Sequence, residues 1–264
     1  MNEAGNKLIF RVFTILWVVF LGCRSAEAKT TYAVIVGIAD YKFSDYRSGD
    51  LRYADHDARR FGAFLQSTAG GSVPAQNIVL LNNRNATKTA IVQAMRLFRK
   101  ATPQDRVIFY FSGHGMKGGF LPYDVSTKHT STILTHREVK ASFKESAAAT
   151  KLCIADACLS GSMTTREAWN APASREPSDS NVVLMLSSRS TQSSVESGTR
   201  RGGVFTYFLL SGLNGKADNN RNHVVTIKEL YDYLAPRIRR ETPNHQSPLF
   251  YGKFSDDLTM STLR

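Results

Sequence analysis

Two residues of this chain, His114 and Cys158, are of the types that form a nucleophilic pair. Each lies in a glycine-containing turn, Ser112-Gly113-His114-Gly115 and Cys158-Leu159-Ser160-Gly161. A free thiol has a pKa of about 8.5, so at neutral pH it needs a nearby base to become a nucleophile. Imidazole can accept the thiol proton, stabilise the thiolate as imidazolium and later protonate a leaving amine. The pair therefore predicts covalent catalysis by a Cys-His dyad.

The backbone N–H groups of Gly115 and Cys158 are candidates for an oxyanion hole, because both lie in the turns that carry the dyad. Each dyad residue also has an ordinary interpretation, His114 as a structural loop histidine and Cys158 as a buried thiol. Other chemistries are less well supported: a phosphatase-type Cys-x5-Arg would need Arg where Thr164 stands, and no Gly-x-Ser-x-Gly motif is present. The remaining histidines are scattered without zinc spacing.

The elements that must position the pair alternate between strands and helices, which predicts a mainly parallel sheet with helical crossovers. Short apolar runs predict strands at Tyr32–Val36, Asn77–Leu81, Arg106–Phe111, Lys151–Ala155, Asn181–Leu186 and Pro248–Tyr251. His114 follows one strand and Cys158 another, and sites in such sheets form just beyond the carboxyl ends of the strands. If the two strands are neighbours, about 5 Å apart, the imidazole and the thiol converge.

Helical spacing of apolar residues predicts the crossovers. The expected helices are Asp55–Leu65, Thr87–Phe98, one opened by the capping box Thr135–Glu138, Val204–Leu213, and Thr226–Arg239 with the capping box Thr226–Glu229. Residues 162–180 are rich in Ser, Thr, Ala and Pro, which predicts a mobile loop. The 264 residues, 42% of them hydrophobic, suit one domain with a sizeable core, spanning 29–264.

Residues 1–28 have the pattern of a signal peptide. Lys7 and Arg11 give a positive start, an apolar stretch follows, and Ala26-Glu27-Ala28 is a small-x-small cleavage signature. We therefore expect an exported, periplasmic or extracellular protein with no membrane span once the peptide is removed. An uncleaved anchor and lipoprotein cleavage at Cys23 remain as alternatives.

The formal charge of +12 is spread through the chain and decides little by itself. A basic soluble surface is the main interpretation, and binding to an anionic envelope surface is an alternative. No nucleic-acid recognition motif accompanies the charge, so nucleic acid is not an expected partner. Cys153 lies in an apolar strand and is interpreted as a core residue.

The segments Phe109–Gly115 and Ile154–Gly161 resemble the His and Cys motifs of the caspase/metacaspase superfamily. Supporting resemblances cover nearly all of the mature chain in family order: Tyr32–Gly37, Leu51–Ala58, Gly203–Thr206 and Gln246–Pro248. The resemblance implies a caspase-like fold, with about six mainly parallel strands flanked by helices on both faces. It also implies a cysteine endopeptidase acting on proteins or peptides.

The resemblance further implies a specificity. In metacaspase-like members, acidic groups form a pocket for Arg or Lys before the scissile bond, and Asp57 and Asp156 match two such aspartates. Ser112 is expected beside them in the substrate-binding site. Carboxylates in a partly desolvated pocket favour a guanidinium through bidentate hydrogen bonds. Asp57 as a first-turn helix residue and Asp156 as a turn residue are the structural alternatives.

No cofactor or metal is expected to be required. Asp124 matches one carboxylate of the calcium site in metacaspases, but Thr165 stands where calcium-dependent members carry an acidic residue, and one carboxylate is insufficient for calcium. Asp218–Glu229 resembles an EF-hand loop, yet His223 replaces the turn glycine, which favours a polar loop leading into a helix cap.

Arg166 and Arg175 in the loop 162–180 are candidate self-processing sites, with ordinary surface arginines as the equal alternative. Together these features predict an exported Arg- or Lys-directed cysteine endopeptidase. The alternative is a catalytically silent caspase-fold scaffold that binds or regulates other molecules.

Overall fold

The computed structural model describes residues 29–43, 49–116, 118–126, 132–157, 181–187, 195–243 and 245–263. The predictions made for residues 1–28, for Cys158 and for the loop 162–180 lie outside the described residues.

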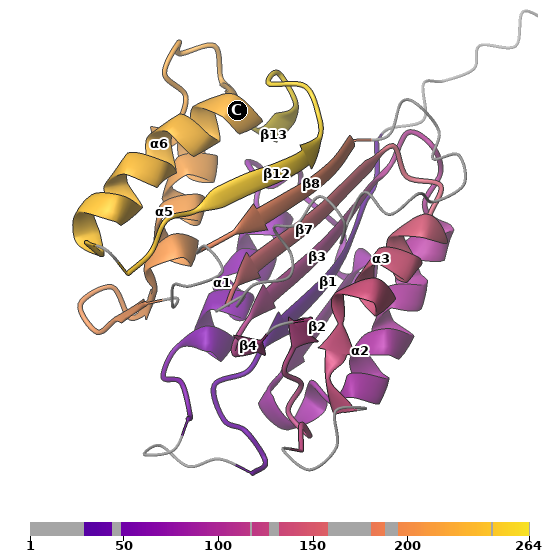
Figure 1. Ribbon diagram of the computed structural model, residues 1–264. Coiled ribbons are helices and arrows are strands. Elements are labelled where there is room, and N and C mark those ends of the chain that lie inside the picture. Colours follow the sequence, from indigo (N-terminus) through magenta and orange to yellow (C-terminus); the bar gives the residue numbers. More distant parts are fainter. Residues whose placement is uncertain are drawn as a thin grey trace, which may run out of the picture.

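A six-stranded sheet forms the centre of the molecule (Figure 1), in the order β12-β8-β7-β3-β1-β2. Its strands are β1 (Thr31–Gly37), β2 (Ile78–Asn82), β3 (Arg106–Ser112), β7 (Thr150–Asp156), β8 (Asn181–Leu186) and β12 (Leu249–Lys253). Five strands run parallel, and β12 runs antiparallel to β8 at the edge. The expected α/β fold with a mainly parallel sheet is confirmed.

The strand predictions succeeded because the inner strands are buried on both faces. In β7 every residue is buried, and in β3 every residue after Arg106 is buried. Such strands appear in a sequence as continuous apolar runs, which are easy to recognise.

Helices cover both faces of the sheet (Figure 1). On one face, α1 (Ala54–Gln66), α5 (Val204–Ser211) and α6 (Ile227–Glu241) contribute to a hydrophobic core. On the other face, α2 (Lys88–Met95) and α3 (His136–Lys144) contribute to a second core. Two predicted helices change geometry near their ends: α2 continues as a 3-10 helix over Arg96–Lys100, and α5 continues as a π-helix over Gly212–Lys216.

Both predicted capping boxes are present. The hydroxyl of Thr135 accepts from the N–H of Glu138, whose carboxylate accepts from the N–H of Thr135; Thr226 and Glu229 repeat this arrangement. Glu229 therefore caps α6.

Asp218 begins the loop Asp218–Glu229, which resembles an EF-hand loop in sequence. Its carboxylate accepts the N–H groups of Asn222 and His223 at 3.1 and 3.0 Å and so closes the loop on itself.

Three small sheets surround the main one and were not predicted. They are β4 (Gly115–Met116) with β5 (Gly119–Phe120) and β6 (Leu134–Thr135), β9 (Glu196–Ser197) with β10 (Gly202–Gly203), and β11 (Val224–Thr226) with β13 (Thr259–Thr262). Strands of two to four residues are too short for an alternating pattern to show. The β9–β10 pair matters most, because it lies against the site.

In the described part of the chain, none of the helices combines the length and the apolar character needed to cross a bilayer.

Candidate active site

The site lies where the strand order reverses. From β1 the chain passes to β2 on one side and then returns to form β3 on the other side of β1. Gly37 pairs with Ser112, and Ser112 pairs with Asp156, so the carboxyl ends of β1, β3 and β7 are level. Ligand sites in open α/β sheets form in the crevice outside such a switch point.

His114 follows β3 and is held by two residues of the segment after β1. Its backbone N–H donates to the hydroxyl of Tyr41 at 2.7 Å, and the two rings lie 5.1 Å apart between centroids. Nε2 of the half-buried imidazole contacts the carbonyl oxygen of Gly49. A Cβ at Gly113 would lie 2.8 Å from the Tyr41 hydroxyl and 3.0 Å from the Phe111 ring, so this close approach requires glycine.

The contact with Gly49 has a chemical consequence for the imidazole. A carbonyl oxygen can only accept, so this contact favours the proton on Nε2 and leaves the lone pair on Nδ1. A neutral imidazole in that tautomer can take a proton at Nδ1 and return it later. A carbonyl partner also fixes the orientation of the ring, as in other histidine sites.

Next to His114 is a cavity of about 220 Å³, which we call the acidic cavity. Its lining residues are Leu51, Ala54, Asp57, Ser112, Gly113, His114, Asp156, Val195, Glu196 and Gly203. Asp57 comes from α1 and Asp156 is the last residue of β7. The two predicted pocket aspartates and Ser112 therefore line one cavity together with His114.

Both aspartates are buried and accept hydrogen bonds from the start of α5. Oδ2 of Asp57 accepts the N–H of Gly203 at 2.7 Å. Oδ2 of Asp156 accepts the N–H and the hydroxyl of Thr206, at 3.1 and 2.8 Å. Among the described residues, Oδ1 of Asp57 has no hydrogen-bond partner, and the guanidinium of Arg60 lies 3.9 Å from it.

This environment raises the pKa of Asp57 to about 8. Burial is the largest cause and the charge of Asp156 is the second, while the Gly203 N–H and Arg60 act in the opposite direction. With a pKa of about 8, Asp57 carries a proton over much of the neutral pH range.

Glu196 is a third carboxylate of the cavity, and the sequence analysis missed it. Its Oε2 and Oε1 accept the N–H groups of Arg52 and Tyr53, each at 2.9 Å. Gly49 and Tyr41, which hold His114, were also missed. No motif marks these residues, since they act through backbone groups or across long sequence separations.

The remaining predicted site residues have different outcomes. Gly115 begins β4 directly after His114, and its role in an oxyanion hole stays a prediction. Cys158 lies outside the described residues; Ser112 and Asp156, which stand two positions before His114 and Cys158, are paired neighbours on β3 and β7. Oδ1 of Asp124 accepts the N–H of Lys88 at the start of α2. Among the described residues, no group of three or more His, Cys, Asp or Glu side chains is arranged so that it could hold a metal ion such as calcium.

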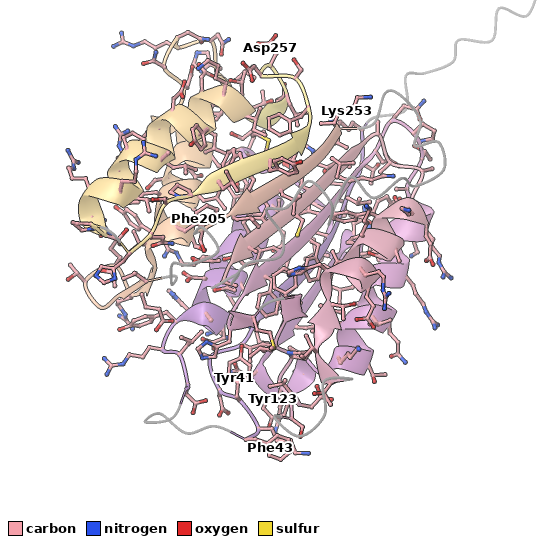
Figure 2. All side chains as sticks on the ribbon, in the orientation of Figure 1. Tyr41, Phe43, Tyr123, Phe205, Lys253 and Asp257 are labelled. Carbon is pink, nitrogen blue, oxygen red and sulfur yellow. The ribbon has the colours of Figure 1, made fainter. Side chains whose placement is uncertain are left out.

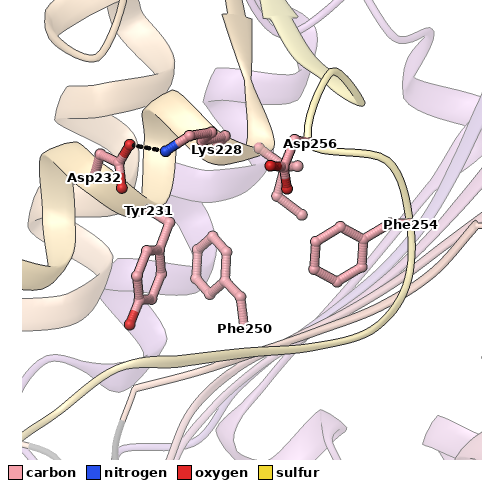
Figure 3. Close-up of a pocket in the computed structure, with 7 residues that line it drawn as sticks. Lys228, Tyr231, Asp232, Phe250, Phe254 and Asp256 are labelled. Carbon is pink, nitrogen blue, oxygen red and sulfur yellow. Dashed lines mark hydrogen bonds and ion pairs between the residues drawn. The ribbon is translucent and has the colours of Figure 1, made fainter.

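A second hollow, of about 320 Å³, lies between α6 and the segment that follows β12 (Figure 3). We call it the aromatic hollow, because Tyr231, Phe250 and Phe254 line it together with Ile227, Lys228, Asp232 and Asp256. Because β12 runs antiparallel to β8, its carboxyl end lies beside the start of β8. Phe254 and Asp256 follow that end, so they lie at the end of the sheet opposite to the one that carries His114. Figure 2 shows this separation, with Tyr41 at one end of the molecule and Lys253 at the other.

Comparisons with known proteins agree with this architecture. The family model of the caspase domain matches residues 30–259. A probable protease of a Desulfuromonadales bacterium is 26% identical over 246 aligned residues, covering 79% of this chain and 30% of that protein. Metacaspase-1A of Aspergillus oryzae is 32% identical over 98 residues, covering 34% of this chain and 22% of that protein. The aligned part thus spans less than a third of either relative.

A crystal structure of a protein from Geobacter sulfurreducens superimposes with a TM-score of 0.61 at 17% identity, covering 89% of this chain and 100% of that one. This likeness shows a shared fold. Because the family model takes in nearly the whole described chain, the chain belongs to the caspase-domain family.

Proposed function

We propose that the protein is a cysteine endopeptidase that cleaves after Arg or Lys. One observation carries the proposal: His114 lines the same cavity as the carboxylates of Asp57, Asp156 and Glu196. The caspase-domain match and the names of the two relatives support a peptidase.

In the proposed reaction, Nδ1 of His114 takes the proton of the Cys158 thiol, and the thiolate attacks the carbonyl carbon of the scissile bond. The N–H groups of Gly115 and Cys158 stabilise the resulting oxyanion. The imidazolium then protonates the leaving amine, and the C–N bond breaks to give a thioester. His114 next takes a proton from water, which attacks the thioester and releases the acid and the thiol.

The acidic cavity gives the proposed specificity. Asp57 and Asp156 are 1% and 4% exposed, so a guanidinium or ammonium group would meet them with little competing water. Entry of the cation would displace the proton on Asp57 and compensate two buried negative charges. An Asp side chain before the scissile bond would add a further negative charge to the same cavity, and we expect it to be rejected.

The test is cleavage of fluorogenic peptides that differ only in the residue before the scissile bond, Arg, Lys or Asp, by the wild type and by Cys158→Ala. We expect turnover of the Arg and Lys peptides that Cys158→Ala abolishes. A preference for Asp would keep the dyad and reject the acidic pocket. Failure to cleave any peptide, with or without calcium, would favour a zymogen or the silent scaffold.

Export and self-processing belong to the same proposal. We propose that residues 1–28 are removed as a signal peptide and that the enzyme cleaves its own chain after Arg166 or Arg175. Intact-mass measurement of the exported protein tests both points. Cys158→Ala should keep the mature N-terminus and lose only the internal cut, whereas an internal cut in that variant would show that another protease makes it.

A further inference from the structure

Glu196 fills a role that the local sequence leaves open. Tyr53 is the N-cap residue of α1 and its side chain makes no capping hydrogen bond. The first N–H groups of a helix need acceptors from outside it. Glu196, 143 positions away from Tyr53, supplies one carboxylate to the N–H groups of both Arg52 and Tyr53. A carboxylate that accepts two backbone N–H groups is a strong and directional anchor.

The anchored segment is the one that reaches His114. Residues 49–53 begin at Gly49, whose carbonyl oxygen contacts Nε2 of His114, and end at the start of α1. Between these ends, Leu51 donates its N–H to the carbonyl of Ala39 at 2.8 Å, and Asp50 accepts the N–H of Tyr41 at 3.0 Å. A shift of the segment at Arg52 and Tyr53 would therefore be passed to the oxygen that orients the imidazole.

Glu196 also belongs to the wall of the acidic cavity. It lies in β9 and pairs with Gly203 of β10, whose N–H donates to Asp57. The two short strands β9 and β10 thus make two contacts. The backbone of β10 donates to the carboxylate of Asp57, and the Glu196 side chain of β9 binds the segment 49–53. The cavity and the orientation of His114 share one structural support.

We propose that Glu196 is a positioning residue that holds the segment 49–53 so that Gly49 orients His114. This inference rests on the proposed function, because it takes Cys158 and His114 to be the reacting pair. It assigns Glu196 a role in the rate of the chemical step in addition to its place in the cavity.

The test is Glu196→Gln in the full chain. The amide oxygen can accept one of the two N–H groups, and the NH₂ group would face the other. We expect kcat on an Arg peptide to fall about 10- to 100-fold, as for a misplaced catalytic group, with KM changed less than about threefold. Glu229→Gln is the matched control, because it removes a capping carboxylate at α6. It should affect thermal stability only.

A second readout does not depend on peptide cleavage. Alkylation of Cys158 by iodoacetamide across pH 5–9, followed by mass spectrometry, reports how far His114 promotes the thiolate. Cys153, the free cysteine within the described residues, is buried with its pKa raised to about 12, and Cys158→Ala provides the blank. We expect the profile of Glu196→Gln to move towards that of His114→Ala.

The outcomes separate the two proposals. If wild type and His114→Ala are alkylated alike, the dyad is wrong and the inference falls with it. If they differ but Glu196→Gln matches the wild type in alkylation and kcat, only the positioning role is wrong. A rise in KM confined to Arg and Lys peptides, with unchanged kcat, would make Glu196 a lining carboxylate and nothing more.

Discussion

The acidic cavity and the aromatic hollow lie at opposite ends of the strands of one sheet, and carboxylates line both. In the aromatic hollow Asp232 forms an ion pair with Lys228 at 2.6 Å, drawn in Figure 3, and the two side chains are 58% and 57% exposed. In the acidic cavity Asp57 and Asp156 are buried and accept hydrogen bonds from backbone N–H groups and a hydroxyl, with the Arg60 guanidinium 3.9 Å from Asp57. Similar residue types thus occupy two different electrostatic environments.

The difference shows which carboxylates are available for chemistry. Exposed ion pairs are solvated and contribute little, and the pKa of Lys228 is raised mainly by its bond to Asp232. Burying a carboxylate is costly even with a guanidinium 3.9 Å away, as for Asp57 and Arg60, and groups with strongly shifted pKa values gather at functional sites. The raised pKa of Asp57 is the sign of that cost. The acidic cavity is therefore prepared for a cation, whereas the aromatic hollow already contains one.

The largest effect should come from adding a methyl group inside the acidic cavity. A Cβ at Gly203 would lie 2.2 Å from Oδ2 of Asp156 and 3.0 Å from Oδ2 of Asp57. Gly203→Ala should lower kcat/KM on Arg peptides by at least about 100-fold, because the carboxylates must move. Gly198→Ala is the control on the same segment, since its Cβ would meet only the Tyr53 hydroxyl at 4.0 Å. Equal losses in both variants would contradict the account.

Two substitutions that each remove one negative charge compare the two regions directly. Asp156→Asn should reduce kcat/KM on Arg peptides about 10- to 100-fold, the value of one charge-assisted hydrogen bond. Asp232→Asn, in the aromatic hollow, should leave kcat/KM unchanged and shift the melting temperature by no more than about 1 °C. Steady-state kinetics and thermal melts of the three proteins measure both. A loss of activity in Asp232→Asn would show that the aromatic hollow takes part in catalysis.

A smaller effect should appear in stability as a function of pH. Asp57 binds its proton more tightly in the folded chain, with a pKa of about 8 against its usual value near 4. Its contribution to stability is therefore complete below about pH 4 and is lost as the pH rises through about 8. Between pH 5 and pH 9 the melting temperature of the wild type should fall about 5 °C more than that of Asp57→Asn. Parallel curves would mean that Asp57 is not the proton-binding group.

The fold could be predicted far more completely than the site. The strands of the sheet appeared as apolar runs because burial on both faces forces them to, and Thr135 and Thr226 marked two helix starts through local capping chemistry. His114 was found because it follows such a strand, whereas Asp156 was assigned to the pocket through the resemblance to a known family. Asp57 required the resemblance to a known family. Its position in the first turns of α1 does not reveal that Asp57 lines the same cavity as Asp156 at the end of β7.

Other parts of the site could not be predicted, for physical reasons. Gly49 acts through its carbonyl oxygen, a group that every residue carries. Glu196 acts through two backbone N–H groups more than a hundred positions away. The strands that carry Glu196 and Gly203 are two residues each, too short for a periodic pattern. Such contacts follow from tertiary packing, which no local signal records.

The most direct test of the central claim compares an Arg peptide with its citrulline analogue, which keeps the shape and loses the charge. We expect the wild type to prefer Arg by at least about 100-fold in kcat/KM, with a ratio that grows from pH 6 to pH 8.5 as Asp57 ionises. In Asp57→Asn the ratio should be smaller and independent of pH. Because His114 and Cys158 act on both peptides, their own ionisation cancels in the ratio. Equal cleavage of the two peptides by the wild type would contradict the claim that buried carboxylates select the substrate.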